Sequence, residues 1–337
     1  MLQINLLVLF LYLSHLINYT NSNTTISMNI STSANYIEIY LKDETLINEM
    51  IIKKNNTQIN PILSWQSTDI NKYYDIYIKE KSLVEIIINT QKSSITLEHF
   101  FYLRIFDGID SIIMETSGSN INVTSMEKLF YDNKNLKSVD LSNFDISGVT
   151  SFKSAFEGCE NLVSVKFGNY TSKNINNMEY MFASCKSLES LDLSSFDTSK
   201  VTSMINLFYE CNNLFSLNIK NFNVENVIHF ESMFAASGIK SLDLRHFKTV
   251  KGNNMSKMFQ DCFSLEFLNL SNFVTSNVLN MSEMFFGCSS LISLDLNNFN
   301  TSNVEYMNGM FEFCTVLTSL KIDNFDVLSI IDMSYMF

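Results

Sequence analysis

Six cysteines are the residues best able to do chemistry, since a thiol can form a disulfide, bind zinc or act as a nucleophile. They all occupy one position, three residues after a repeating phenylalanine: Cys159, Cys185, Cys211, Cys262, Cys288 and Cys314. The chain has no C-x-x-C pair, so the spacing does not indicate zinc. The same position holds Asn133 and Ser237 in two other repeats, which shows that it accepts any small side chain. We therefore expect a ladder of buried free thiols, because in-register side chains on parallel coils point alongside one another.

Histidines and nucleophiles form no catalytic pattern in this chain. His15 lies in an apolar N-terminal run, and His99, His229 and His246 have no repeated carboxylate or nucleophile beside them. The sequence contains no G-x-S-x-G, no glycine-rich phosphate loop and no H-E-x-x-H. The many methionines stand at core-facing spacing. We expect a protein that is not an enzyme and that needs no soluble cofactor.

Carboxylates recur on the outward side of the repeat but are diluted by other residues. The central outward position reads Asp140, Lys166, Asp192, Asn218, Asp243, Asn269, Asp295 and Lys321. Stacked carboxylates roughly 5 Å apart would repel one another, and alternation with lysine or asparagine relieves this. A calcium ladder would need clustered carboxylates. We therefore expect no metal site.

The elements that must position these residues follow from a repeat. The anchoring phenylalanines are Phe130, Phe156, Phe182, Phe208, Phe234, Phe259, Phe285, Phe311 and Phe337, and each step is 26 residues except one of 25. An L-x-x-L-x-L core with the two-residue period of a strand follows the anchor, and an M-x-x-M-F segment has helical spacing. One unit is too small to bury its own apolar side, so units must stack. The repeat predicts a parallel solenoid in which each coil has a short strand and a short helix.

The repeat resembles that of the BspA-like leucine-rich-repeat surface proteins. The matching stretches run from Leu188 to Val201 and from Leu291 to Val304, and they read L-x-S-L-D-L-x-x-F-x-T-S-x-V. The resemblance implies an α/β fold, namely a right-handed leucine-rich-repeat-like solenoid with parallel short strands and short helices. It also implies a secreted or surface-attached adhesion or interaction protein without catalytic activity.

Composition along the chain suggests four regions. Residues 1–22 resemble a signal peptide because an apolar run precedes the first charged side chain, Glu38. Residues 23–82 alternate polar and apolar and predict a β-rich N-terminal cap. Residues 83–124 are interpreted as degenerate coils, and 125–337 as tandem repeats of 25–26 residues with the last one truncated. A secreted glycoprotein could carry glycans at the sequons of Asn23, Asn29, Asn55, Asn122, Asn169, Asn254, Asn269, Asn280 and Asn300.

The net charge and the pattern of surface residues indicate which classes of partner the protein binds. The formal net charge of −12 disfavours nucleic acid as a partner. We expect a secreted or cell-surface protein that binds host, matrix or neighbouring-cell proteins through the exposed face of the solenoid, with its membrane attachment left open. The alternative is a structural coat or wall component that packs on itself without a specific soluble ligand.

One neighbourhood departs from the regular surface, around the 25-residue unit. The candidate protein-contact patch consists of Asp243, Arg245, His246, Phe267 and Asn269. Arginine and aromatic side chains are typical interface anchors. The competing interpretation is drift, in which Phe267 covers a gap left by the shortened repeat.

Overall fold

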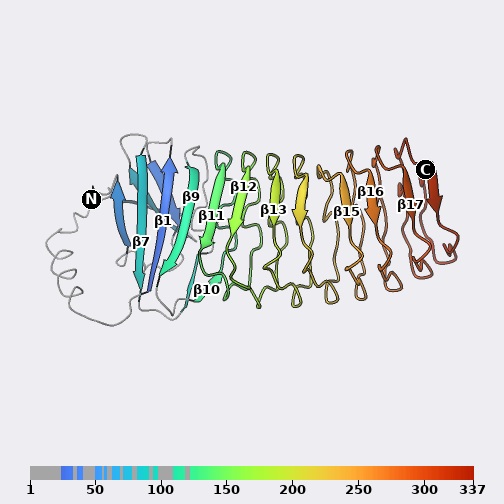
Figure 1. The fold of residues 1–337 in the computed structure, drawn as a ribbon, viewed down its shortest axis with the longest axis horizontal. Helices are drawn as coiled ribbons and strands as arrows, with labels where there is room; N and C mark the ends of the chain where they lie inside the picture. Colours follow the sequence, from blue (N-terminus) through green and yellow to red (C-terminus); the bar gives the residue numbers. More distant parts are fainter. Residues whose placement is uncertain are drawn as a thin grey trace.

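The computed structural model describes the backbone of most of the chain and the side chains of its repeats. Described are residues 24–32, 36–40, 50–54, 57–58, 63–68, 71–77, 82–90, 94–97, 109–117 and 122–337, with side chains at 97, 111–114 and 123–337. The predicted signal peptide, residues 1–22, lies outside these residues. Strands stack along one long axis (Figure 1), and no described residue is helical.

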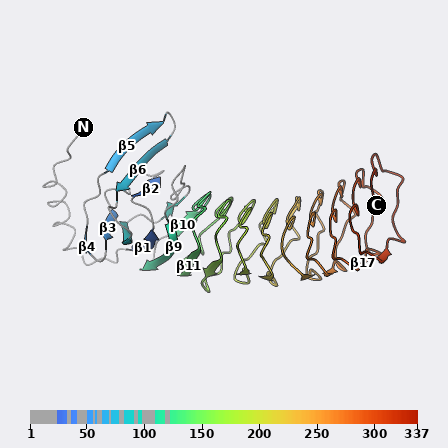
Figure 2. The same ribbon diagram turned by 90° about the horizontal axis from the view of Figure 1, so that it is seen from above.

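The first strands have from two to nine residues and are mostly antiparallel. They are β1 (Thr24–Thr32), β2 (Tyr36–Tyr40), β3 (Met50–Lys54), β4 (Thr57–Gln58), β5 (Leu63–Thr68), β6 (Asn71–Tyr77), β7 (Ser82–Thr90), β8 (Ser94–Thr96), β9 (Ile109–Ser117) and β10 (Asn122–Ser125). β1 pairs antiparallel with β7 and β9, while β2, β6 and β5 form a separate sheet (Figure 2). The segment from Leu83 to Ile88, interpreted above as part of a degenerate coil, lies in β7 and pairs antiparallel with β1 and β3. Ile109 to Met114 lies in β9, which does run parallel to β11.

The repeats form a parallel β-solenoid with one short strand per coil. These strands are β11 (Ser138–Asn143), β12 (Ser164–Phe167), β13 (Ser190–Asp192), β14 (Ser216–Asn218), β15 (Ser241–Asp243), β16 (Phe267–Asn269), β17 (Ser293–Asp295) and β18 (Ser319–Lys321). We number the coils 1 to 8 after them. β11 to β14 extend the sheet of β9 and β1, whereas β15–β16 and β17–β18 form two-stranded sheets. The predicted parallel solenoid is confirmed.

The predicted short helices are wrong, because the M-x-x-M-F segment forms consecutive tight turns. In coil 7 the Met284 amide donates to the Met281 carbonyl at 3.2 Å, and Glu283 between them has a left-handed φ of 56°. Alternate amides point along the solenoid, as when Phe285 donates to the Met310 carbonyl of the next coil at 3.0 Å. Tandem turns of this kind place residues three and four apart on one side, which is also the spacing of a helix. The described repeats are therefore all-β, and the α/β class is corrected.

Aromatic and aliphatic rows fill the interior. The anchoring phenylalanines stack from coil to coil with ring centroids 5.1 to 6.1 Å apart. A second row stacks Phe247, Phe273 and Phe299 at 6.3 and 6.2 Å. Most leucines of the strands and most methionines of the turns are buried beside these rows. The core is thus one continuous cluster that runs along the axis.

The 25-residue unit shortens coil 5 at the corner before its strand. Gly238 occupies this corner, and a Cβ there would lie 2.1 Å from the Asn212 carbonyl oxygen of coil 4. Real Cβ atoms do not approach an oxygen so closely, so only glycine lets the shortened corner approach its neighbour.

Candidate functional site

The cysteine ladder lies inside the solenoid and makes one repeated contact. Each Sγ donates to the carbonyl oxygen of the anchoring phenylalanine in the preceding coil, at 3.0 to 3.2 Å. All six are free thiols; five are buried and Cys314 is half-buried. Burial raises the pKa of every one of them, to about 11 for Cys262 and for Cys314. The predicted ladder of buried thiols is confirmed, and its sulfurs are structural hydrogen-bond donors rather than nucleophiles.

Thiol reactivity should report this burial directly. Denatured protein, without prior reduction, should react with six equivalents of a disulfide-type thiol reagent at neutral pH. Folded protein should react first at Cys314, and only slowly at the five buried thiols. Burial keeps the reagent away from these thiols, and their raised pKa lowers the fraction that is thiolate at neutral pH. Fewer than six reactive thiols in denaturant would reveal disulfides and contradict the ladder.

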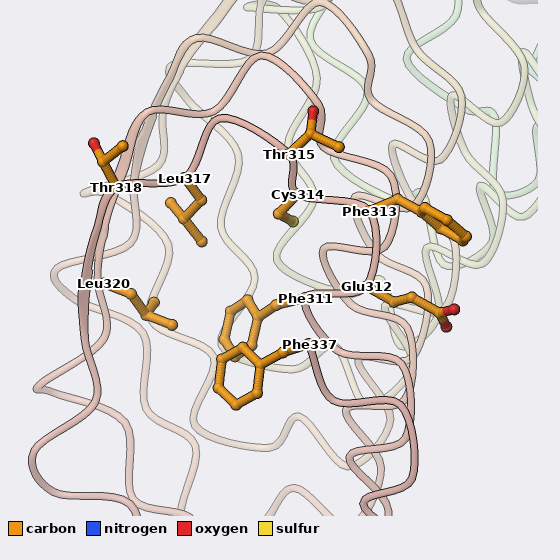
Figure 3. A pocket seen from close by; sticks show the side chains of 9 residues that line it. All are labelled: Phe311, Glu312, Phe313, Cys314, Thr315, Leu317, Thr318, Leu320 and Phe337. Carbon is orange, nitrogen blue, oxygen red and sulfur yellow. The ribbon is translucent and has the colours of Figure 1, made fainter.

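A pocket of 560 Å³ opens at the C-terminal coils (Figure 3). It is lined by Phe311, Glu312, Phe313, Cys314, Thr315, Leu317, Thr318, Leu320 and Phe337. The Phe311 and Phe337 rings stack with their centroids 5.6 Å apart, in the same way as the anchoring phenylalanines of all the preceding coils. Its apolar lining is therefore the core row of coil 8, and it shows no pair of catalytic groups.

The aspartate row on the strand face is neutralised from coil to coil. The Lys166 ammonium lies 3.7 Å from Asp140, and the Lys321 ammonium lies 2.8 Å from Asp295. The Asn218 amide donates to Asp192 at 3.0 Å. Within the described part of the chain, no three histidine, cysteine or carboxylate side chains are grouped so as to hold a metal ion.

The predicted contact patch is assembled by the pairing of β15 with β16. Asp243 lies opposite Asn269, and Ser241 lies opposite Phe267. Arg245 is exposed and turns back on its own coil, with Nη2 2.7 Å from Asp243 Oδ2. Hydrogen bonds from Arg245 lower the pKa of Asp243. Four of the five predicted residues therefore lie together on the outer surface of coils 5 and 6.

His246, the fifth residue, has a structural contact. Its Nε2 lies 3.0 Å from the carbonyl oxygen of Ile219 in coil 4. Two coils further on, Asn298 makes the equivalent contact, donating from Nδ2 to the Leu270 carbonyl at 3.0 Å. His246 therefore replaces an asparagine that joins neighbouring coils, which explains this departure from the repeat without a ligand.

Two exposed apolar residues beside the patch were missed by the sequence analysis. Phe215 of coil 4 and Ile292 of coil 7 are 61% and 58% exposed, and Phe267 is 51% exposed. Phe215 and Ile292 each directly precede the first residue of a strand, a position that varies freely between repeats, so no periodic signal marks them. The exposure of Phe267 also argues against its filling a gap in the core.

The repeats match one family model over most of the solenoid. The Mycoplasma protein of unknown function family, DUF285, matches residues 124–247, 176–267 and 253–337. The chain belongs to the DUF285 family. No curated protein and no solved structure was found to match it. Among the described residues, no helix of this DUF285 chain has the length and apolar character needed to cross a bilayer.

The DUF285 repeats contain a further polar row that sequence analysis did not single out. The threonine of the F-x-T segment is buried in four coils, at Thr198, Thr249, Thr275 and Thr301. Each hydroxyl donates to a carbonyl of the next coil and accepts from the amide of that coil, as Thr275 does with the Asn300 carbonyl at 2.9 Å and amide at 2.8 Å. One side chain therefore satisfies two backbone groups of its neighbour. The only signal was the repeated F-x-T segment, which continues as a T-S pair in three of the four coils.

Proposed function

We propose that this chain is a non-enzymatic secreted or cell-surface protein that binds other proteins through the strand face of its solenoid. A stack of coils offers a broad, regular surface whose outward residues vary while the core repeats, and this suits recognition of a protein partner. We also propose the adhesion role that the resemblance to BspA-like proteins implies. The apolar run before Glu38 and the exposed sequon residues Asn169 and Asn300 support secretion.

The observation that carries the proposal is the set of large apolar side chains on an otherwise polar face. Phe215, Phe267 and Ile292 are each more than half exposed, among serines, aspartates and asparagines. Protein interfaces place such anchors at their centre and surround them with polar residues that exclude water. Arg245, held by Asp243 beside them, supplies the charged anchor that such interfaces favour.

Binding should depend on the anchors while folding should not. Changing Phe267→Ser and Arg245→Ser together should weaken binding to an immobilised matrix or cell-surface protein fraction by about 2 kcal/mol or more. Both side chains are exposed, so the melting curve should remain nearly unchanged. Biolayer interferometry and thermal unfolding on the same preparations provide the two readouts.

A matched control removes an equally exposed ring elsewhere. Phe313 is 59% exposed and lies in a turn rather than on the strand face, so Phe313→Ser should leave binding intact. Equal binding by the wild-type chain and the double variant would discard the patch. A lowered melting temperature in the double variant would instead identify Phe267 as a packing residue.

A further inference from the structure

One outward-facing row of four residues across coils 4 to 7 could pair with the same row of a second copy running in the opposite direction. The row consists of the residue that directly precedes each strand: Phe215, Lys240, Glu266 and Ile292. It reads apolar, positive, negative, apolar. All four side chains are exposed. Within the described residues, neither Lys240 nor Glu266 has an ion-pair partner within 4.0 Å.

A two-fold axis makes this order self-complementary. If the axis lies in the plane of the face, parallel to the strands and between coils 5 and 6, it reverses the order of the coils. It does not change the position along the strand, so a residue that precedes a strand faces a residue that precedes a strand in the second copy. Lys240 then faces Glu266 of the second copy, and this contact occurs twice. Phe215 faces Ile292 of the second copy, also twice, and flanks the charges with apolar contacts.

The neighbouring rows obey the same symmetry. In the central row, Asn218 faces Asp295 of the second copy, and Asp243 faces Asn269 of the second copy. One coil further out, Asp192 faces Lys321 of the second copy. Although the chain carries a net charge of −12, no carboxylate in these coils meets another carboxylate. In the serine row, Phe267 faces the small Ser241, which leaves room for its ring.

We propose that two copies of this chain associate through the strand faces of coils 4 to 7, with their solenoid axes antiparallel. This rests on the proposed function, that the strand face binds protein, and it names a second copy as one partner. Opposite charges that face each other fix the register, and like charges penalise every shift by one coil. The exposed apolar residues of this face are then covered in the dimer.

Charge-reversal variants at Lys240 and Glu266, made in the full chain, test this arrangement. Sedimentation velocity over a concentration series should show a reversible monomer–dimer equilibrium. Lys240→Glu and Glu266→Lys, each alone, should weaken association at least tenfold, because each change places like charges opposite one another at two contacts. An equimolar mixture of the two single variants should form dimers again, and the variant with both changes should dimerise as the wild type does. Lys173→Glu, an equal charge change on an exposed loop off the strand face, should have no effect.

The outcomes separate this proposal from the broader one. A monomer at all concentrations would overturn self-association, while binding of the same preparation to matrix or cell-surface proteins would still support the proposed function. If association is unchanged by both single charge changes, the contact lies elsewhere, for example near Phe337, and this result would also overturn the proposal. If the variants weaken the dimer but their mixture does not restore it, the antiparallel register is wrong.

Discussion

Replacing Phe234 by alanine is expected to lower the free energy of unfolding by about 3–5 kcal/mol. The ring is completely buried and stacks on Phe208 and on Phe259, with centroids 5.6 Å from each. Truncation leaves a cavity in the middle of a continuous row, and each coil is stabilised only by its two neighbours. The loss should therefore reach both adjacent coils. Urea unfolding followed by far-UV circular dichroism measures the total.

The control for this prediction is an exposed ring in the next coil that lies outside the core. Phe263 is 59% exposed, so Phe263→Ala should change stability by less than 0.5 kcal/mol in either direction, roughly the limit for surface sites. Hydrogen exchange should lose protection in coils 4 to 6 of the Phe234→Ala protein before it does so elsewhere. A change below about 1 kcal/mol would contradict the stacked row as a source of stability.

Changing Thr275→Val is expected to lower the free energy of unfolding by about 2–6 kcal/mol, although the side chain keeps its size. The hydroxyl serves both the carbonyl and the amide of Asn300, and valine leaves both without that partner. Thr275 is buried, and each backbone group that loses its partner there costs about 1–3 kcal/mol where water does not replace the hydroxyl. Denaturant midpoints compare the variants.

Thr275→Ser separates the hydrogen bonds from the methyl group. Serine keeps the hydroxyl and loses only a methyl, so it should be less destabilising than valine. A serine, Ser172, occupies the equivalent buried position in coil 2, although its hydroxyl donates to the Val149 carbonyl of coil 1 and not to the next coil. The reverse order of the two variants would mean that packing of the methyl, and not the hydroxyl, matters at this position.

The repeating core could be predicted from the sequence because the same physical requirement recurs in every unit. Leucines at strand period, anchoring phenylalanines and small residues at the cysteine position all follow from stacking coil on coil. The turns were mistaken for helices because M-x-x-M-F places its apolar side chains on one side in either structure. Only the left-handed backbone at residues such as Glu283 distinguishes the two structures. In the described repeats a glycine occupies this position only in coil 8, at Gly309, so the sequence gives little sign of it.

The candidate surface was harder to predict, because it depends on single residues and not on a period. Phe267 stood out since it replaces a serine in an otherwise regular row. Phe215 and Ile292 occupy a row without a consensus residue, so nothing in the sequence marks them as exposed. His246 also stood out because it departs from the repeat, but its contact is structural. It is an unusual residue that takes over the ordinary asparagine contact between coils, as its hydrogen bond to Ile219 shows.

The left-handed turns also limit how these repeats can drift in evolution. In the described chain, fourteen non-glycine residues and three glycines have positive φ, spread through the turns of successive coils. They include lysine, aspartate, serine, tyrosine and glutamate, but no valine, isoleucine, threonine or proline. β-branched side chains are disfavoured in this conformation and proline is excluded from it. Duplicated coils can therefore exchange charge and size freely at these positions and alter the outer surface, while only side-chain branching and ring closure are selected against.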